Sequence, residues 1–470
     1  MKNGFTLIEL LGVIILLSIL VLLAYPALQG LLKKQTYEVD NTTRQMIYKA
    51  SDLYISDNSH SFKKINGRNK CIALTTLVDE GLLKYPVKLF SNKTDISDIK
   101  TVSVLYNDGF KYSLVDNEDC IDNTKAYMVS LPDGKYFKEN DYLTKIKTVN
   151  FVDYIDTEGS LKTYDLTDKE LSPNKSIIAW IDSDYNLFIG SVSDIYTKDL
   201  SYAFNGMSSV TDFNFDNLNT SENKNLKLTF SHMTNLVSLN LSNFDTSSTQ
   251  NMADAFSYNT NLLNINLNGL DTSNVTDMRR MFKFCSSLET IDLSPLNTKK
   301  VTQIQQMFEN CSSLKELDLS TFDTSSAQNM TYMFSDCEKL EELNISSFNT
   351  SKVNDMQYMF NECHSLSSLD VTNFNTTKVK SMTGMFKGLR KISSLDLSSF
   401  DTTALAVVDL MFSSDYSLTN LNLSKAKFSS VTSYIGMFNG VPNNISIISN
   451  SDGASFLRDR LGQDVGTITY

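Results

Sequence analysis

The chain has 470 residues, 41% of them hydrophobic, and a formal net charge of -12. This length exceeds what one hydrophobic core usually organises, so we expect more than one domain. No long segment supplies the clustered Lys and Arg that phosphate binding needs, so we expect no nucleic-acid partner. The three histidines, His60, His232 and His364, lack the spacing of metal ligands. The sequence therefore predicts neither a metal site nor a cofactor.

An apolar run of 20 residues, 5–24, opens the chain. At about 1.5 Å per residue, a helix of this length can cross a hydrocarbon layer of about 30 Å, so we predict a membrane span. The one charge within the run is Glu9. An acidic side chain inside such a helix costs about 2.5 to 3.5 kcal/mol, so Glu9 needs an interaction that offsets this cost.

The residues around this run are not those of an ordinary secretory signal. Only residues 1–4 precede the run, and no small-residue cleavage site follows it. The string GFTLIE at residues 4–9, followed by the apolar run and Pro26, resembles the type IV prepilins and pseudopilins. The resemblance implies that a prepilin peptidase cuts after Gly4 and methylates the new terminal amine of Phe5.

The same resemblance gives Glu9 a role in filament assembly. The positive amine of one subunit could pair with the buried Glu9 of another pilin subunit, which would offset the desolvation of both charges. The alternative is a plain signal anchor whose Glu9 extends to the membrane surface.

Beyond the membrane span, apolar residues continue at three- and four-residue spacing. The pattern predicts one long helix over residues 5–58, with Pro26 as a kink because proline removes a backbone donor. Residues 59–148 should form a small pilin-like α+β domain, with a helical segment at 74–83 and strands at 102–106 and 110–114.

The first two cysteines, Cys71 and Cys120, flank this small domain. If the domain is exported, they could close a disulfide worth roughly 3 to 4 kcal/mol. Two separate buried thiols are the alternative.

Phenylalanine recurs at one fixed interval in the second half of the chain, the interval that separates Phe204 from Phe230. A strict period of this kind indicates units that bury their apolar faces only against their neighbours. We call the ten residues the phenylalanine ladder: Phe204, Phe230, Phe256, Phe282, Phe308, Phe334, Phe360, Phe386, Phe412 and Phe438.

One repeat illustrates the expected structure. Leu317 and Leu319 would share the inner face of a strand, and residues 323–324 would form a turn. Met330, Met333 and Phe334 have the spacing of a short helix or 3₁₀ segment.

The pattern LxxLxLSxFDTS followed by VxxMxxMF resembles the BspA-like leucine-rich repeats of bacterial surface proteins, several of them implicated in adhesion. The resemblance implies a solenoid over residues 204–440 that serves display and contact, capped by residues 149–203 and 441–470. The expected fold class is therefore α+β: a long pilin helix with a small α+β domain, then a leucine-rich-repeat solenoid of parallel strands and short helices.

Four cysteines follow the same period, three residues after a ladder phenylalanine: Cys285, Cys311, Cys337 and Cys363. Met207 and Met233 occupy this column in earlier repeats, which favours buried reduced thiols over disulfides between neighbouring repeats.

Acidic side chains gather on the outward face of the predicted strands. Stacked carboxylates repel one another, so this face would favour a basic partner or loosely held cations, although a solvated face that keeps the protein soluble is the alternative. The candidate ligand residues are Asp292, Glu316, Asp318, Glu342, Asp370 and Asp396.

These observations favour a type IV pilin-like subunit, minor because the solenoid is bulky, that is anchored in the membrane before assembly and then displayed at the cell surface. Its partners would be the prepilin peptidase, other pilin subunits and an extracellular protein or surface ligand. The alternatives are a surface adhesin that never polymerises and a pseudopilin of a secretion or uptake machine. We expect no enzyme, because the sequence offers no nucleophile with a placed base, no metal set and no phosphate loop.

Overall fold

The structure is a computed structural model. It describes residues 41–57, 69–84, 87–88, 96, 100–106, 110–116, 126–131, 137–138, 141–172, 175–191, 193–461 and 467–469. The chain forms two compact units, residues 1–123 and 124–470. The boundary that we expected between residues 148 and 149 therefore lies inside the second unit. The reason is that strand β4 (Ala126–Tyr127) pairs with β9 (Ile195–Tyr196) of that unit.

The predicted N-terminal features lie outside the described residues. They are the leader, the membrane span over 5–24, and the residues Gly4, Phe5, Glu9 and Pro26. Among the helices that the structure describes, none combines the length and the apolar character needed to cross a membrane.

The first unit packs helices against a small antiparallel sheet. The sheet has the order β1-β2-β3, with Asn69 opposite Leu105 and Tyr106 opposite Phe110. Ile47, Ala50 and Ile55 recur along one face of the first helix and are buried in the core. The elements are α2 (Asn41–Asp57), β1 (Asn69–Ala73), α4 (Leu74–Asp79), β2 (Lys100–Tyr106) and β3 (Phe110–Asp116).

The expected helix at 74–83 and both expected strands are thus present, although the helix ends at Asp79. Cys71 takes part in a disulfide bond. Its predicted partner, Cys120, lies outside the described residues.

The second unit begins with sheets that cover the first repeat. One sheet has the order β10-β5-β8-β7-β6, and a smaller one has the order β11-β9-β4. Phe151 of β5 packs edge-on against Phe204, with ring centroids 6.2 Å apart, so this part shares one core with the repeats. The elements are α5 (Tyr142–Lys145), β5 (Thr148–Val152), β6 (Lys162–Asp165), β7 (Ile178–Ile181), β8 (Asn186–Gly190), β10 (Asp212–Asn214) and β11 (Leu218–Asn219).

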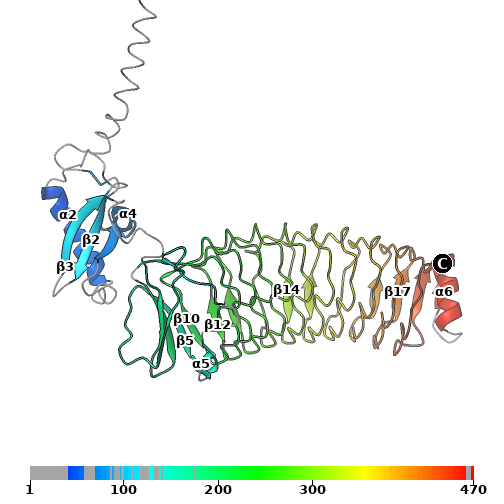
Figure 1. Cartoon of the computed structure of the whole chain (residues 1–470). Coiled ribbons are helices and arrows are strands. Elements are labelled where there is room, and N and C mark those ends of the chain that lie inside the picture. The colour runs from blue at the N-terminus through cyan, green and yellow to red at the C-terminus, as the bar shows by residue number, and fades with distance from the viewer. Residues whose placement is uncertain are drawn as a thin grey trace, which may run out of the picture. The chain divides into compact units, whose positions relative to one another are not determined.

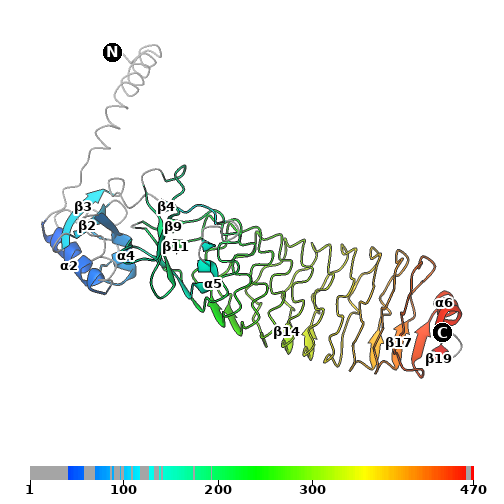
Figure 2. The ribbon, with the colours of Figure 1, turned by 60° about the horizontal axis from the view of Figure 1, so that its bottom comes forward.

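The rest of the second unit is a strand-rich domain of repeats that lie side by side in a row (Figures 1 and 2). We call the edge with short parallel strands the strand side. Partners there lie one repeat apart, as in Leu317 opposite Leu343. The strands are β12 (Ser238–Asn240), β13 (Asn264–Asn266), β14 (Glu316–Asp318), β15 (Glu342–Asn344), β16 (Ser394–Asp396), β17 (Asn420–Leu423), β18 (Ser446–Ser449) and β19 (Thr467–Thr469), with helix α6 (Ser451–Leu461) between the last two.

The phenylalanine ladder runs through the core of this row. Consecutive rings from Phe204 to Phe438 have centroids 5.2 to 6.0 Å apart. The first nine are fully buried, whereas Phe438 is only partly buried. The prediction that equivalent rings stack into a ladder between neighbouring repeats is therefore confirmed.

A second set of contacts joins the repeats through buried threonine hydroxyls. Thr324 donates a hydrogen bond to the carbonyl of Asn349 at 3.1 Å and accepts one from the same residue's N–H at 2.8 Å. Each hydroxyl thus satisfies buried polar groups of the next repeat. Seven threonines donate in this way: Thr246, Thr272, Thr298, Thr324, Thr350, Thr376 and Thr402.

The predicted short helix in each repeat is wrong. The segment that includes Met330, Met333 and Phe334 forms successive turns, because Tyr332 and Asp336 have positive φ angles of 55° and 61°. Alternate N–H groups of this segment donate to the next repeat instead of back along a helix: Tyr332 donates to Gln357 at 2.9 Å and Phe334 to Met359 at 2.9 Å. We call this edge, from five residues before to two residues after each ladder phenylalanine, the turn side.

The cysteine column consists of free, fully buried thiols, as expected: Cys285, Cys311, Cys337 and Cys363. Each thiol donates to the carbonyl of a ladder phenylalanine 29 residues earlier, at 3.0 to 3.2 Å. Burial raises the pKa of the Cys285 thiol to about 12, so this group stays protonated at neutral pH.

Truncating one ladder ring should reveal the coupling between repeats. Phe308→Ala should cost roughly 3 to 5 kcal/mol, because the ring is buried between two neighbours. Phe438→Ala should cost less, because that ring is partly buried and has one ladder neighbour. Urea denaturation of a protein comprising residues 124–470 measures both costs. Equal losses at the two positions would contradict nearest-neighbour coupling.

Candidate interaction surface

The acidic residues expected on the strand side do lie on its outer face, but only some of them gather. Asp292, Glu316, Asp318 and Glu342 line an open hollow of about 790 Å³. Glu316 and Glu342 are directly opposite each other on β14 and β15. Asp370 and Asp396 belong to the same column but do not line this hollow.

The aspartates of this column have a local structural task. Each accepts a hydrogen bond on its side-chain oxygen from the backbone N–H two residues later, at 2.9 to 3.0 Å, an arrangement that closes the turn after each strand. Asparagine does the same at 3.0 to 3.2 Å, which explains why either residue can occupy this column. The column comprises Asn240, Asn266, Asp292, Asp318, Asn344, Asp370, Asp396 and Asn422.

These bonds keep the carboxylates ionised. Hydrogen bonds from the side chain and backbone of Ser294 lower the pKa of Asp292, and those from Ser320 lower the pKa of Asp318. Thr372 lowers the pKa of Asp370 in the same way. The aspartates thus contribute negative charge to the surface, while one oxygen of each is committed to its own turn.

The two glutamates are better placed to bind a partner. Glu316 and Glu342 are exposed, and neither carboxylate has a hydrogen-bond partner among the described residues. Nearby, Lys315 pairs with Glu289 at 2.6 Å, but both side chains are more than half exposed, so this pair stabilises little. The hollow is therefore an acidic surface suited to a basic group.

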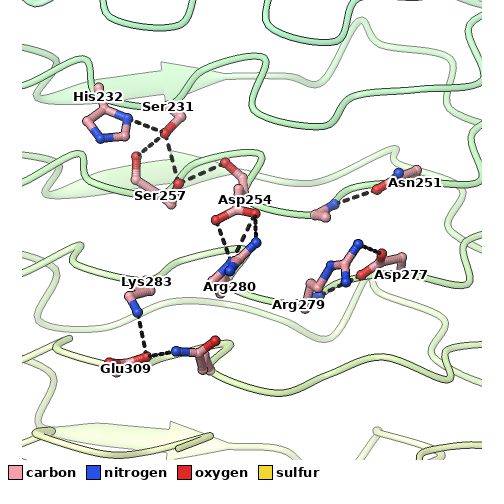
Figure 3. A network of polar contacts seen from close by, with 12 residues as sticks. Ser231, His232, Asn251, Asp254, Ser257, Asp277, Arg279, Arg280, Lys283 and Glu309 are labelled. Atoms are coloured by element: carbon pink, nitrogen blue, oxygen red, sulfur yellow. Dashed lines mark hydrogen bonds and ion pairs between the residues drawn. The ribbon is translucent and has the colours of Figure 1, made fainter.

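Charges on the turn side are arranged differently. Figure 3 shows that they pair with one another across neighbouring repeats. Arg280 Nε lies 2.9 Å from Asp254 Oδ1, and Lys283 Nζ lies 2.8 Å from Glu309 Oε2. Within one repeat, Arg279 also pairs with Asp277 at 3.1 Å.

One histidine belongs to this network. The side chain of His232 stacks on Tyr258, with ring centroids 4.3 Å apart. Its Nδ1 lies 2.8 Å from Ser231 Oγ (Figure 3). Burial lowers the pKa of His232, although nearby Asp254 opposes that shift. This histidine is part of the packing between repeats. Among the described residues, no group of histidine, cysteine and carboxylate side chains could hold a metal ion.

A buried carboxyl group occupies the cysteine column near its end. Asp415 is 1% exposed, and its Oδ1 accepts a hydrogen bond from the N–H of Leu389 at 2.7 Å. Burial raises its pKa to about 9. Asn259 occupies the same column, accepts from Met233 N–H and donates to the carbonyl of Phe230, both at 2.8 Å. A neutral aspartic acid therefore replaces an amide of nearly the same shape.

Asp415→Asn should remove a pH dependence of stability. The unfolded side chain loses its proton near pH 4, whereas the folded one keeps it until about pH 9, so the wild-type free energy of unfolding falls as pH rises between these values. Relative to wild type, the free energy of unfolding of Asp415→Asn should increase by up to about 1.4 kcal/mol for each pH unit of rise between these values. Urea denaturation at pH 5 and pH 8 tests this, with the exposed Asp396→Asn as control. Parallel pH profiles for wild type and Asp415→Asn would contradict it.

Comparison with known proteins places most of the chain in a family. Residues 198–315, 284–369 and 342–450 match the family described as "Mycoplasma protein of unknown function, DUF285". Together these segments span residues 198–450, more than half of the chain, so the chain belongs to this family. Residues 1–25 match the prokaryotic N-terminal methylation motif. No curated protein matches the chain.

Two solved structures illustrate the more distant similarity. The crystal structure of the pneumococcal vaccine antigen PcpA is 13% identical with a TM-score of 0.31, and the match covers 79% of this chain and 97% of that one. The TLR13-ssRNA13 complex is 15% identical with a TM-score of 0.21, and the match covers 55% of this chain and 45% of that one. With TM-scores below 0.5, neither similarity carries an argument about fold or function.

Proposed function

We propose that this protein is a type IV pilin-like minor subunit that displays a leucine-rich-repeat solenoid of the BspA-like kind at the cell surface. The observation that carries the proposal is the methylation motif at residues 1–25 in a chain whose second unit is a row of repeats. That motif indicates a membrane-anchored precursor that a prepilin peptidase processes and that assembles with other pilins. Gly4 and Phe5 are the proposed cleavage and methylation residues, and Glu9 pairs with the amine of a neighbouring subunit.

The chemistry of the cysteines supports export. Cys71 is disulfide-bonded, a state typical of oxidising compartments outside the cytosol. The four cysteines of the repeats are fully buried and so protected from oxidation and exchange. A chain of this kind can pass through an oxidising compartment with one type of cysteine bonded and the other reduced.

The role we propose for the repeat domain is binding, not catalysis. The outer face of the strand side presents Glu316 and Glu342 beside ionised aspartates, which favours an extracellular protein with a basic surface and disfavours nucleic acid. The many other polar groups of the repeats bond to the backbone or to neighbouring repeats, as Asp318 and Thr324 do. A subunit of this kind serves contact at the surface.

Assembly into filaments should depend on the leader and on Glu9. The mature chain should begin at Phe5 with a methylated amine, which terminal peptide mass analysis decides. The wild type and the exposed control Glu80→Ala should appear in sheared surface filaments, whereas Glu9→Ala should stay in the membrane fraction. An intact Met1 would contradict prepilin processing. Glu9→Ala in the filaments at the wild-type level would contradict the proposed role of Glu9 in assembly, and absence of the wild type from filaments would favour a surface adhesin that does not polymerise.

A further inference from the structure

On the turn side, three backbone N–H groups of each of the first nine repeats donate toward the C-terminal end of the row: those of the ladder phenylalanine and of the residues two before and two after it. The N–H groups of Leu410, Phe412 and Ser414 donate to carbonyls of the next repeat, at 2.9, 2.9 and 2.6 Å. The same positions donate forward in the earlier repeats, from Tyr202, Phe204 and Gly206 onward. Positive φ angles two residues before and two residues after each ladder phenylalanine accompany this arrangement, in which these N–H groups point toward the C-terminal end of the row and the paired carbonyls toward the N-terminal end.

The last repeat therefore presents backbone N–H donors for which no following repeat supplies acceptors within the described part of the chain. Gly436, Phe438 and Gly440 occupy the donating positions, and their N–H groups have no acceptor within the described part of the chain. The two glycines have φ angles of 63° and 83°, which a residue without a Cβ adopts at little cost. A row of unpaired N–H groups along one backbone edge is a ready template for the carbonyls of an added segment.

The two sides of the row end at different places. On the strand side, β18 and β19 continue the parallel pairing beyond β17, and α6 lies at the same end (Figure 1). Phe456 of α6 stacks on Phe428, with ring centroids 4.7 Å apart. Among the described residues, no further segment pairs with the backbone of residues 436–440. Within the described part of the chain, the turn side thus lacks a cover of the kind that closes the strand side.

The uncovered edge also exposes apolar surface. Ile435 is 74% exposed, and Phe438 is the one partly buried ring of the phenylalanine ladder. In every earlier repeat the next ring covers this position. Open backbone donors beside an uncovered apolar ring are the features that allow an added strand to bind.

Hydrogen-bond complementarity restricts what can occupy this edge. A second copy in a two-fold contact would place donors against donors, so it cannot pair here. The other end of its repeats is covered by its own strands, because Phe213 of β10 packs on Phe204 with centroids 5.3 Å apart. An anion could bind one amide but would leave the aromatic ring of Phe438 uncovered. An occupant needs carbonyl groups at two-residue spacing and an apolar side chain.

We propose that residues 435–440 form a docking site for an extended segment of a partner protein, which adds to the row as another repeat would. Its backbone carbonyls accept hydrogen bonds from Gly436, Phe438 and Gly440, and an apolar side chain covers Phe438. The site lies at the end of the row and not in the acidic hollow. The inference rests on the open backbone donors and the exposed apolar side chains of this edge, and it does not depend on the pilin-like role.

A peptide copied from the chain's own repeats is a suitable probe. The sequence of residues 379–389, VKSMTGMFKGL, contains a ladder phenylalanine with glycine at both positive-φ positions and no cysteine. Fluorescence anisotropy of the labelled peptide with the full chain in detergent should show saturable binding. Ile435→Lys should weaken binding at least about tenfold, because a charge on an edge opposes strand addition. Asn439→Lys, at an exposed position of the same edge, should do the same.

The controls separate this site from general attraction to an acidic protein. Ile448→Lys changes an exposed residue of β18 and should bind the peptide as wild type does. A scrambled peptide of equal charge should not bind. Hydrogen exchange on the free chain should be faster at residues 436–440 than at 410–414 and should slow when the peptide binds. Protection of 436–440 without peptide, equal binding of the scrambled peptide, or unchanged binding to Ile435→Lys would overturn the proposal.

Discussion

The structure of the second unit depends on one constraint: no repeat can satisfy its own backbone. On the turn side, N–H groups find their acceptors in the next repeat, as Phe334 does with Met359. On the strand side, parallel partners lie one repeat apart, as Leu317 and Leu343 do. A buried backbone group without a partner costs about as much as a lost hydrogen bond, so a fixed register between repeats is required wherever they stack.

The side chains that recur with the period all serve this constraint. Phenylalanine rings fill the core between repeats, and threonine hydroxyls such as that of Thr324 bond the next repeat through both donor and acceptor. Asp318 and its equivalents close the turn after each strand. Because these groups bond within the row, few of them are left to bind anything else. The surface chemistry is concentrated in exposed glutamates on the strand side and in the backbone of the last repeat.

Sequence reasoning predicted the periodic core well and the polar parts poorly. Phe308, Leu317 and Cys311 are buried where the period placed them, because a strict repeat leaves an apolar side chain one equivalent environment. The short helix or 3₁₀ segment expected at Met330 and Met333 is absent, because side-chain spacing does not reveal the positive φ angles of Tyr332 and nearby Asp336. The hydrogen bond by which Asp318 closes the turn after its strand was also not predicted. The sequence does carry a signal of such turns, because a Ser, Thr or Asn lies two residues after each Asp or Asn of this column.

The central claim is that the register between neighbouring repeats holds the second unit together, and deletions test it most directly. Removing residues 313–338 deletes one whole period and restores every pairing across the junction. Removing residues 314–338 leaves one residue of that period behind and shifts every later residue by one position. In a protein comprising residues 124–470, the first deletion should keep one cooperative urea transition with a smaller m-value, and the second should lose cooperativity or fail to fold. Equal tolerance of the two deletions would contradict the account.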